Sequence, residues 1–501
     1  MPSDTVTHYK STRSSSITST FSSALTSGYA PDGGLFVPNL IPRFSEVELE
    51  GMKGLQFDDL AYAVLRPFVP ASEIPDDDLK GIIASAFSLF HSTDRVELSQ
   101  PDASGGNLVS ELFHGPTFCF KDFGLQLLTG FISYFTPSQG EEKRTLILST
   151  TGDTGPAALA GVKHCANPNL NAMCFYPAGQ ISDFQRRQMT SLLASPNIVV
   201  VEFEGSGDDM DAPIKSLQSD AAFMQKTGLA GVNSYNIGRP LAQMVHYFWT
   251  VFRALENPTN KEKNVSKINI VIPTGAMGNI TACYLSKLSG LQIRHISAAT
   301  NVNDVTFRTF NNGDLSRNPV MHMTLSDAIN IQVPYNMERI LYYKSGGDED
   351  RVKGWMEGVY NDGKVVVEEA FVKIIQEEFK SERVTDEELK ETMKKYKIEF
   401  GYYADPHTCV AIKCAEKLGW EGPDTVIMST ASPCKFKESV VTCLGEEGWK
   451  DYYENVCPEY AKEVPAGETE DKFAKAEGGD LEQSQKAWEK RTREIIVERF
   501  F

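Results

Sequence analysis

From residue 144 onward, short apolar runs alternate with longer segments whose apolar residues recur at helical spacing. The apolar runs include RTLILST (144–150), NAMCFYP (171–177), NIVVVEFEG (197–205), INIVIP (268–273) and DTVIMST (424–430). Strand–loop–helix units of this length predict a mainly parallel sheet that helices cover on both faces. Sheets of this kind bind ligands at the carboxyl ends of their strands. We therefore expect an α/β fold in which the loops that follow strands gather on one side.

The length of 501 residues exceeds one ordinary hydrophobic core and predicts about three domain-sized units. Residues 1–95 contain helical apolar spacing after residue 45 and are expected to form an N-terminal subdomain. Residues 96–445 hold the alternating pattern. Residues 446–501 are acidic and are expected to form a surface tail that ends in an amphipathic helix around WEKRTREIIVERFF.

The composition describes a soluble globular chain and excludes several classes of partner. No apolar run reaches the length of about 18 residues that a membrane span requires. The net charge of −18 argues against nucleic acid or an anionic membrane, so an anionic substrate needs a local positive pocket. Nine cysteines without a CxxC pair indicate reduced thiols, and no metal-ligand spacing joins them to the eight histidines. We therefore expect no metal.

A lysine stands at the end of ELFHGPTFCFKD, directly before a segment of helical spacing that begins at Phe123. Asp122 is a plausible N-cap for this helix, which would place Lys121 at a helix N-terminus among aromatic side chains. A low dielectric and the positive end of the helix dipole both favour a neutral amine over an ammonium. A neutral amine is what a Schiff-base lysine requires. A lysine whose stem lies along the surface is the ordinary alternative.

Three loops that follow predicted strands carry residues typical of anion sites. They are STTGDTG (Ser149–Gly155), PTGAMGN (Pro273–Asn279) and STASPCKF (Ser429–Phe436). Hydroxyls, and backbone N–H groups that glycines leave accessible before a helix, bind anions. No Walker lysine and no GxGxxG accompany them, which disfavours a nucleotide-binding α/β protein. Each loop taken alone is also typical of an ordinary turn or cap.

A further segment, NSYNIGR (Asn233–Arg239), groups amides, hydroxyls and a guanidinium within seven residues. Arginine is the side chain best suited to two-pronged phosphate binding. A surface loop with a solvated arginine is the ordinary alternative. The segment therefore gains its significance only together with the three loops.

Together these motifs resemble the threonine synthase family, whose members are pyridoxal phosphate enzymes of fold type II. The resemblance implies an N-terminal subdomain followed by two α/β lobes with mainly parallel sheets, which hold the cofactor between them. It covers almost everything before residue 445. It is carried by YKSTRS, SGYAPDGGLFVP, ELFHGPTFCFKD, STTGDTG, VNSYNIGR, IPTGAMGN, ADPHT and STASPCKF.

The resemblance implies a role for each matching residue. Lys121 would form the Schiff base with pyridoxal 5′-phosphate and later move protons, and Thr430 would hydrogen-bond the pyridine nitrogen as a neutral partner. In ADPHT, Asp405 is expected to cap a helix and His407 to be structural. The cofactor phosphate would be held by the backbone of Gly275, Ala276, Met277, Gly278 and Asn279. The substrate carboxylate and the cofactor's 3′-oxygen would be bound by Thr150, Thr151, Asp153 and Thr154, and the substrate phosphate by Ser234, Asn236 and Arg239.

The expected reaction converts O-phospho-L-homoserine and water to L-threonine and phosphate. The family's usual phosphate loop reads Gly-Asn-Phe-Gly-Asp, however, whereas this chain has Gly275-Ala276-Met277-Gly278-Asn279. PTGAMGN and IQVPYNMER (Ile331–Arg339) look closer to animal threonine synthase-like proteins, which release phosphate and form 2-oxobutyrate and ammonia. STASPCKF and ADPHT resemble the fungal-type synthases. The phospho-lyase reaction therefore stays open as an alternative.

A catalytically inactive binding protein is a further alternative, which the retention of Lys121, Asp153, Arg239 and Thr430 disfavours. The expected partner is a small phosphorylated amino acid, and the chain is expected to be a monomer or a small homo-oligomer. Because the family motif begins at Tyr9, only eight residues precede it. We therefore expect a cytoplasmic protein without a transit peptide.

Overall fold

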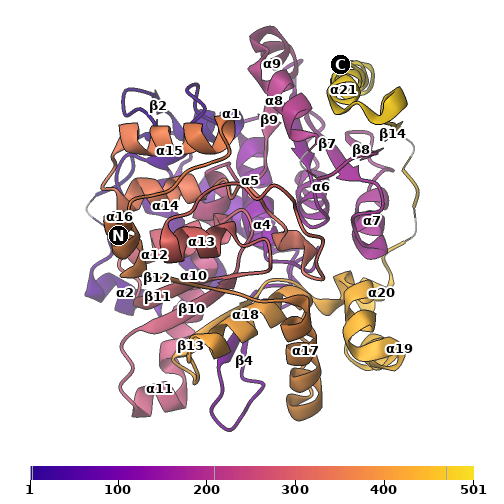
Figure 1. Cartoon of the computed structure of the whole chain (residues 1–501). Coiled ribbons are helices and arrows are strands. Elements are labelled where there is room, and N and C mark those ends of the chain that lie inside the picture. The colour runs from indigo at the N-terminus through magenta and orange to yellow at the C-terminus, as the bar shows by residue number, and fades with distance from the viewer. Residues whose placement is uncertain (1, 3, 208, 466, 470) are drawn as a thin grey trace.

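The computed structural model describes residues 2, 4–207, 209–465, 467–469 and 471–501. Three sheets and the helices around them make up the described chain (Figure 1). The N-terminal sheet is antiparallel and has the strand order β2-β1-β3. Its strands are β1 (Tyr9–Ser11), β2 (Thr18–Ser19) and β3 (Phe36–Pro38), and the helices that follow are α1 (Phe21–Ser27), α2 (Glu46–Met52), α3 (Phe57–Leu65), η1 (Arg66–Phe68) and α4 (Asp76–Phe87).

The largest sheet has six strands in the order β12-β11-β10-β13-β5-β4. All neighbours are parallel except β4, which runs antiparallel to β5. Every residue of β10 and β13 is buried, as expected for central strands covered on both faces. The strands are β4 (Glu97–Ser99), β5 (Leu108–Glu111), β10 (Ile268–Pro273), β11 (Ile293–Thr300), β12 (Phe379–Arg383) and β13 (Thr425–Ser429).

A second, fully parallel sheet has five strands in the order β14-β8-β7-β6-β9. The mainly parallel α/β fold predicted from the alternating pattern is therefore confirmed. The strands are β6 (Arg144–Ser149), β7 (Leu170–Pro177), β8 (Ile198–Phe203), β9 (Leu229–Gly231) and β14 (Asp471–Phe473).

Two long apolar helices, α5 (Lys121–Tyr134) and α10 (Gly238–Glu256), pack against each other, and most of their residues are buried. The other helices lie around the two parallel sheets (Figure 1). No helix in the described part of the chain is both long and apolar enough to cross a membrane. The helices that lie around the two sheets are α6 (Thr154–Cys165), α7 (Asp183–Thr190), α8 (Asp211–Ser219), α9 (Ala221–Thr227), α11 (Pro258–Glu262), α12 (Gly278–Leu288), α13 (Val305–Asn312), η2 (Asp327–Ile329), α14 (Met337–Lys344), α15 (Glu349–Asn361), α16 (Glu369–Gln376), α17 (Asp386–Phe400), α18 (Pro406–Lys417), η3 (Pro433–Lys435), α19 (Lys437–Asn455), α20 (Glu459–Lys462), η4 (Glu477–Gly479) and α21 (Leu481–Phe500).

The C-terminal segment is built into the fold rather than lying on its surface. Its strand β14 extends the five-stranded sheet by pairing with β8, and its helix α21 buries Trp488, Ile496 and Phe500 in the same apolar cluster as that sheet. The expected amphipathic helix is present, but the expected surface tail is wrong. The division at residue 446 stays a prediction, although α19 has a non-helical glycine at Gly445.

Candidate active site

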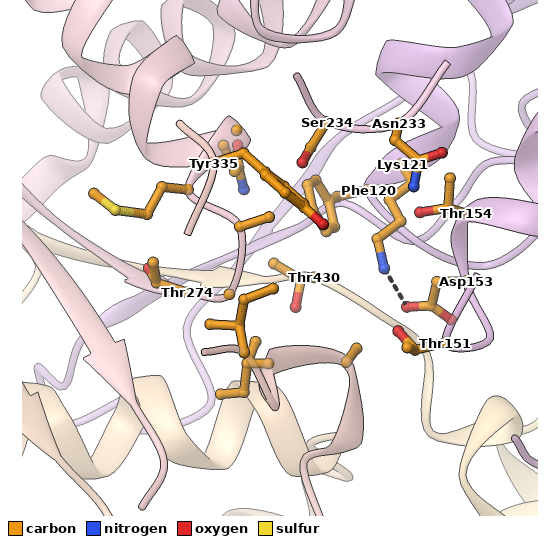
Figure 2. Close-up of a pocket in the computed structure, with 18 of the residues that line it drawn as sticks. Phe120, Lys121, Thr151, Asp153, Thr154, Asn233, Ser234, Thr274, Tyr335 and Thr430 are labelled. Atoms are coloured by element: carbon orange, nitrogen blue, oxygen red, sulfur yellow. Dashed lines mark hydrogen bonds and ion pairs between the residues drawn. The ribbon is translucent and has the colours of Figure 1, made fainter. Parts of the chain in front are cut away.

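One pocket collects the loops that follow strands of both parallel sheets, as the sequence predicted (Figure 2). The loop after β6, the loop after β10 and the residue after β13 meet there with the start of α5. The predicted site residues that line the pocket are Lys121, Thr150, Thr151, Asp153, Thr154, Ser234, Arg239, Gly275, Ala276, Met277, Gly278, Asn279 and Thr430.

Lys121 is the first residue of α5, so the side chain leaves the helix at its N-terminus. The predicted N-cap is wrong, because Asp122 lies within the first turn. Its buried carboxylate instead accepts hydrogen bonds from the backbone N–H and the hydroxyl of Thr117, at 2.9 and 2.7 Å. Between them, Phe118 has a φ of 62°, a left-handed conformation that non-glycine residues rarely adopt. The preceding loop is thus folded tightly back onto the helix start and fixes the position of Lys121.

The amine of Lys121 lies 3.1 Å from Oδ2 of Asp153 (Figure 2). The predicted surroundings were apolar, whereas the structure gives the amine a carboxylate partner that is 3% exposed. Burial by itself would raise the pKa of Asp153, but the nearby charges of Lys121 and Lys435 outweigh burial and lower the pKa well below its usual range. Asp153 is therefore a permanent anion in the pocket wall.

The conformation of the STTGDTG loop keeps Asp153 in place. Gln185, at the start of α7, donates to Oδ1 of Asp153 at 2.8 Å. Gly152 has a φ of 123°, and a Cβ there would lie 2.3 Å from the Gln185 amide oxygen, so only glycine fits. The hydroxyl of Thr150 accepts from the backbone N–H groups of Gly152 and Gly155 at 3.1 and 3.0 Å. Thr150 thus holds the shape of the loop, a role the sequence did not predict.

Lys435 is a further cation at this end of the pocket, and the sequence analysis did not identify it. Its side chain is fully buried, and its amine lies 3.4 Å from Oδ1 of Asp153. It also donates to the backbone oxygen of Thr117 at 2.8 Å and to the side-chain oxygen of Gln188 at 2.7 Å. A charged residue among the small and apolar residues of STASPCKF was the one available signal.

The loop after β10 forms the opposite end of the pocket, at the start of α12. Met277 precedes the helix with a φ of 63°, so the loop adopts a tight left-handed turn. The first N–H groups of a helix have no partner within the helix and bind anions. Asn279 adds a buried amide Nδ2 that has no partner among the described residues, while its Oδ1 accepts from the Tyr247 hydroxyl at 2.8 Å. These donors make the loop suitable for a phosphate.

Arg239, near the start of α10, is 4% exposed and lines the same pocket. Its one hydrogen bond to the described chain is a long contact of 3.4 Å with the backbone oxygen of Val232, and its Nε has no partner there. Burial lowers the pKa of Arg239 to about 10, so the side chain stays charged at neutral pH. A buried cation without a carboxylate partner in the described chain calls for an anionic ligand.

The structure separates Asn236 from its predicted neighbours. Ser234 lines the pocket beside Arg239, but Asn236 does not. The buried amide of Asn236 donates to the backbone oxygens of Leu25 and Gly231, and its oxygen accepts from the N–H of Gly238. Because backbone groups of α1, β9 and α10 engage the whole side chain, the structure does not support the predicted contact of Asn236 with the substrate phosphate.

Several residues that line the pocket were not among the predicted site residues. From IQVPYNMER, Ile331 and Tyr335 line the wall, and the Tyr335 hydroxyl donates to Asp211 at 2.6 Å. His407 also lines the pocket, and its ring accepts from the backbone N–H of Ala328 at 3.1 Å. Asp405 caps α18, as predicted, and lies 2.8 Å from the other ring nitrogen of His407.

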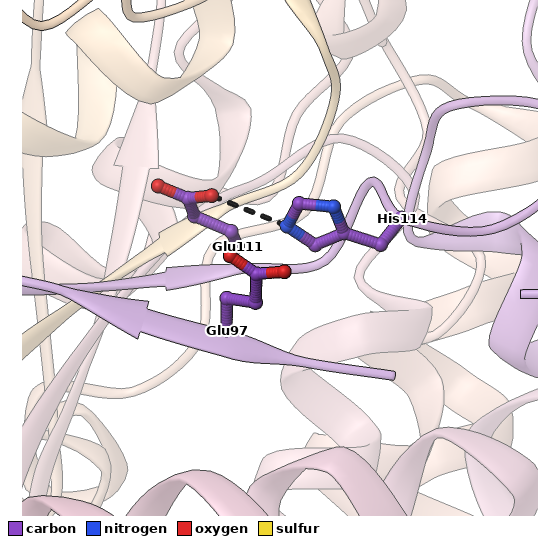
Figure 3. Close-up of side chains that lie close together, drawn as sticks. All are labelled: Glu97, Glu111 and His114. Atoms are coloured by element: carbon purple, nitrogen blue, oxygen red, sulfur yellow. Dashed lines mark hydrogen bonds and ion pairs between the residues drawn. The ribbon is translucent and has the colours of Figure 1, made fainter. Parts of the chain in front are cut away.

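Among the described residues, one group of three side chains has the spacing of metal ligands (Figure 3). It consists of Glu97, Glu111 and His114 and lies apart from the residues that line the pocket. Glu111 already accepts hydrogen bonds from Ser99 at 2.8 Å and Tyr402 at 3.2 Å, and it pairs with His114 at 3.2 Å. Protein groups thus account for the arrangement of Glu111.

The pocket residues fit pyridoxal phosphate. The amine of Lys121 is positioned to react with an aldehyde. The Nδ2 of Asn279 and the N–H groups at the start of α12 are donors for a phosphate group. Thr430 presents a neutral hydroxyl between these two ends (Figure 2).

Comparison with known proteins identifies the family of the chain. A family model described as the threonine synthase N terminus matches residues 8–87. Threonine synthase from Saccharomyces cerevisiae is 35% identical, over 91% of this chain and 93% of the relative. Human threonine synthase-like 2 is also 35% identical, over 86% of this chain and 88% of the relative.

Solved structures extend the similarity to almost the whole chain. The crystal structure of threonine synthase from yeast superposes with a TM-score of 0.86 at 32% identity, covering 97% of this chain and 99% of the other. The PLP-bound threonine synthase from Brucella melitensis gives a TM-score of 0.83 at 31% identity, with the same coverage. Fold and site thus define an enzyme of the fold-type-II pyridoxal phosphate class. Within that class, the chain belongs to the threonine synthase family.

Proposed function

We propose that this protein converts O-phospho-L-homoserine and water to L-threonine and phosphate, with pyridoxal phosphate as cofactor. The observation that carries the proposal is the presence of two different cations in one pocket. Lys121 is paired with Asp153 at 3.1 Å, whereas Arg239 has no carboxylate partner in the described chain. A phosphorylated amino acid that reacts at a lysine-bound cofactor needs both groups.

When bound, pyridoxal phosphate supplies an electron sink for the negative charge that develops beside the substrate amino group. Lys121 takes the proton from the substrate α-carbon, and Asp153 holds the amine in position. The backbone of residues 275–279 would hold the cofactor phosphate, and Thr430 would hydrogen-bond the ring nitrogen. Arg239 and Ser234 hold the phosphate that leaves the substrate. The hydroxyls of Thr151 and Thr154 bind the substrate carboxylate at the start of α6.

A second reaction of the same site has its own support. Threonine synthase-like 2 is as similar to this chain as the yeast synthase is. Ile331 and Tyr335, from the stretch that resembles the animal proteins, line the pocket wall. An apolar wall that keeps water from the substrate β-carbon would favour release of 2-oxobutyrate and ammonia. The phospho-lyase reaction is therefore the second candidate.

One assay separates the reactions. The purified protein is incubated with O-phosphohomoserine, and phosphate, threonine and 2-oxobutyrate are measured in the same sample. We expect threonine in amounts equal to phosphate. Equal amounts of phosphate and 2-oxobutyrate without threonine would identify the lyase. A protein that binds pyridoxal phosphate but releases no phosphate would be an inactive binding protein or an enzyme for another substrate.

We further propose that the protein works in the cytoplasm as a monomer or a small homo-oligomer. One chain brings Lys121, Arg239 and Thr430 into the same pocket. Size-exclusion chromatography with light scattering measures the oligomeric state. Imaging of the protein tagged at its C-terminus measures the compartment.

A further inference from the structure

Lys435 is a fully buried lysine that lies behind the pocket rather than in its lining. It ends the short helix η3, which follows β13 of the six-stranded sheet after residues 430–432. A buried ammonium is costly unless its protons are bound. Oxygens of Thr117, Gln188 and Asp153 surround it at 2.8, 2.7 and 3.4 Å.

These three oxygens come from different parts of the fold. Thr117 lies in the loop before α5, Gln188 lies on α7, and Asp153 directly precedes α6. The ammonium of Lys435 therefore joins the strand end of one sheet to helices that follow strands of the other. Gln188 closes the arrangement, because its own amide nitrogen donates to the Thr117 oxygen at 3.2 Å.

The two oxygens of the Asp153 carboxylate have different partners. Oδ1 faces Lys435 at 3.4 Å and accepts from Gln185 at 2.8 Å. Oδ2 faces Lys121 at 3.1 Å. One carboxylate is thus shared by two cations, and Lys435 and Gln185 occupy the side that is turned away from the reactive amine.

We propose that Lys435 is a positioning residue, which keeps Asp153 charged and its Oδ2 turned toward Lys121 while the Lys121 amine carries no proton. This inference rests on the proposed role of Lys121. Once Lys121 gives up its proton, it no longer balances the Asp153 carboxylate, and a buried carboxylate without a cation is strongly unfavourable. Lys435 supplies the remaining positive charge, so that proton loss from Lys121 does not isolate the anion.

Other titratable groups surround this arrangement and must be held constant in a test. Asp122, His407, Cys119 and Cys434 lie near the Lys121–Asp153–Lys435 group. Burial raises the pKa of Asp122 to about 6. Measurements above pH 7 therefore keep the Asp122 charge unchanged. Burial alone would lower the pKa of His407, but hydrogen bonds to Asp327 and Asp405 outweigh burial and raise it to about 9. His407 thus titrates within the labelling range in wild type and variants alike, so the difference between their midpoints reports the contribution of Lys435.

The test uses the apoenzyme and needs neither cofactor nor substrate. Trace labelling with acetic anhydride between pH 7 and pH 11, followed by peptide mass spectrometry, gives the pH at which half of Lys121 is reactive. In Lys435→Met the whole Asp153 charge acts on Lys121, so we expect the midpoint to rise by about one pH unit. Lys435→Arg keeps a cation at this position, so we expect its labelling midpoint to lie close to the wild-type value.

Lys344→Met is the matched control, because Lys344 is also nearly buried, is ion-paired with Glu378 at 2.8 Å and lies outside the pocket lining. It is expected to leave the Lys121 midpoint unchanged. Gln188→Met removes one oxygen from Lys435 without removing the cation, and we expect a smaller shift in the same direction. This variant replaces Lys435→Met in the test if Lys435→Met does not fold.

The inference is overturned if a folded Lys435→Met protein has the wild-type midpoint, or if Lys344→Met shifts it equally. In the case that Lys435→Met does not fold, an unchanged midpoint in Gln188→Met overturns it. Because labelling is independent of turnover, a protein that makes no threonine can still show the shift. Failure of the proposed reaction and failure of this inference are therefore distinguishable.

Discussion

The two ends of the pocket differ in how far the protein satisfies its own polar groups. At the reactive end, Lys121, Asp153 and Lys435 form a chain of paired charges, to which Gln185 and Gln188 add hydrogen bonds. At the phosphate end, Nδ2 of Asn279 and Nε of Arg239 have no partner in the described chain. The reactive end is thus complete without a ligand, whereas the phosphate end is not.

This difference indicates that the reactive end contributes to the stability of the apoprotein and the phosphate end to the affinity for ligands. Buried charges that are paired lower the free energy of the folded state only while every partner is present. Buried donors without partners raise the free energy of the folded state, and an anion that binds them lowers it again. Substitutions at the reactive end should therefore destabilise the apoprotein, and those at the phosphate end should mainly weaken ligand binding.

The largest expected effect is the loss of the reactive amine. Lys121→Ala should lower turnover by at least about 10⁴-fold, since it removes both the covalent link and the proton carrier. Borohydride reduction of the wild-type protein with cofactor should attach the label to the peptide that contains Lys121, and the variant should not be labelled. Labelling of another lysine in the variant would contradict this assignment.

Next comes the shared carboxylate. Asp153→Asn leaves two buried cations without an anion, and we expect a loss of about 3–5 kcal/mol in the free energy of unfolding. Because the folded state lowers the pKa of Asp153, its contribution is complete above about pH 4 and is lost as the pH falls through the lowered pKa. Urea denaturation of the apoprotein at pH 7 and pH 3 should show the difference between wild type and variant shrinking in acid. A difference that grows in acid would reverse the sign and refute the pairing.

Arg239 gives the converse test at the phosphate end. Arg239→Met should weaken inhibition by inorganic phosphate by about 1.5–3 kcal/mol while leaving the apoprotein equally or more stable. Calorimetry with phosphate and urea denaturation without it measure the two effects separately. Arg239→Lys should recover only part of the affinity, because an ammonium does not make the two-pronged contact. Equal losses of unfolding free energy in Asp153→Asn and Arg239→Met would contradict the difference between the two ends.

The smallest effect is expected at Thr430, which lies between the two ends. Thr430→Val replaces the neutral hydroxyl with a methyl group and keeps the shape of the side chain. It should weaken cofactor binding by about 0.5–1.5 kcal/mol. Thr430→Ser keeps the hydroxyl and serves as the control. Fluorescence titration of the apoprotein with pyridoxal phosphate measures both variants. A wild-type affinity in Thr430→Val would show that the hydroxyl does not contact the cofactor.

The sequence predicted the parallel α/β fold and most of the pocket because both depend on local patterns. Buried parallel strands appear as continuous apolar runs, and their carboxyl ends lie on one side whatever the strand order is. Lys121 and the PTGAMGN loop could therefore be found from their own neighbours in the sequence.

Contacts between distant segments could not be predicted in this way. Lys435 and Gln188 are 247 residues apart, and no periodicity relates them. The role of Asn236 could not be predicted because an amide in an anion-binding loop can equally well bind backbone groups of neighbouring elements, here those of Leu25 in α1 and Gly238 in α10. Asp122 satisfies the N-cap pattern, but Thr117 donates to its carboxylate, and the helix begins at Lys121, two residues before the predicted start at Phe123. For Asn236, and in part for Asp122, the competing partner is a backbone group, which every sequence contains.

The pairing of β14 with β8 has a consequence for how the protein is made. Until β14 pairs with it, β8 is an unprotected edge of the five-stranded sheet, with backbone groups that can bind other chains. The contact between Glu204 and Lys475 spans 271 residues, which a ribosome needs roughly 15–50 s to add. The nascent chain therefore passes through a long interval in which its second sheet is formed but open at one side. Expression at low temperature lengthens that interval. Chaperones that bind exposed strand edges should reduce the binding of other chains to the open edge.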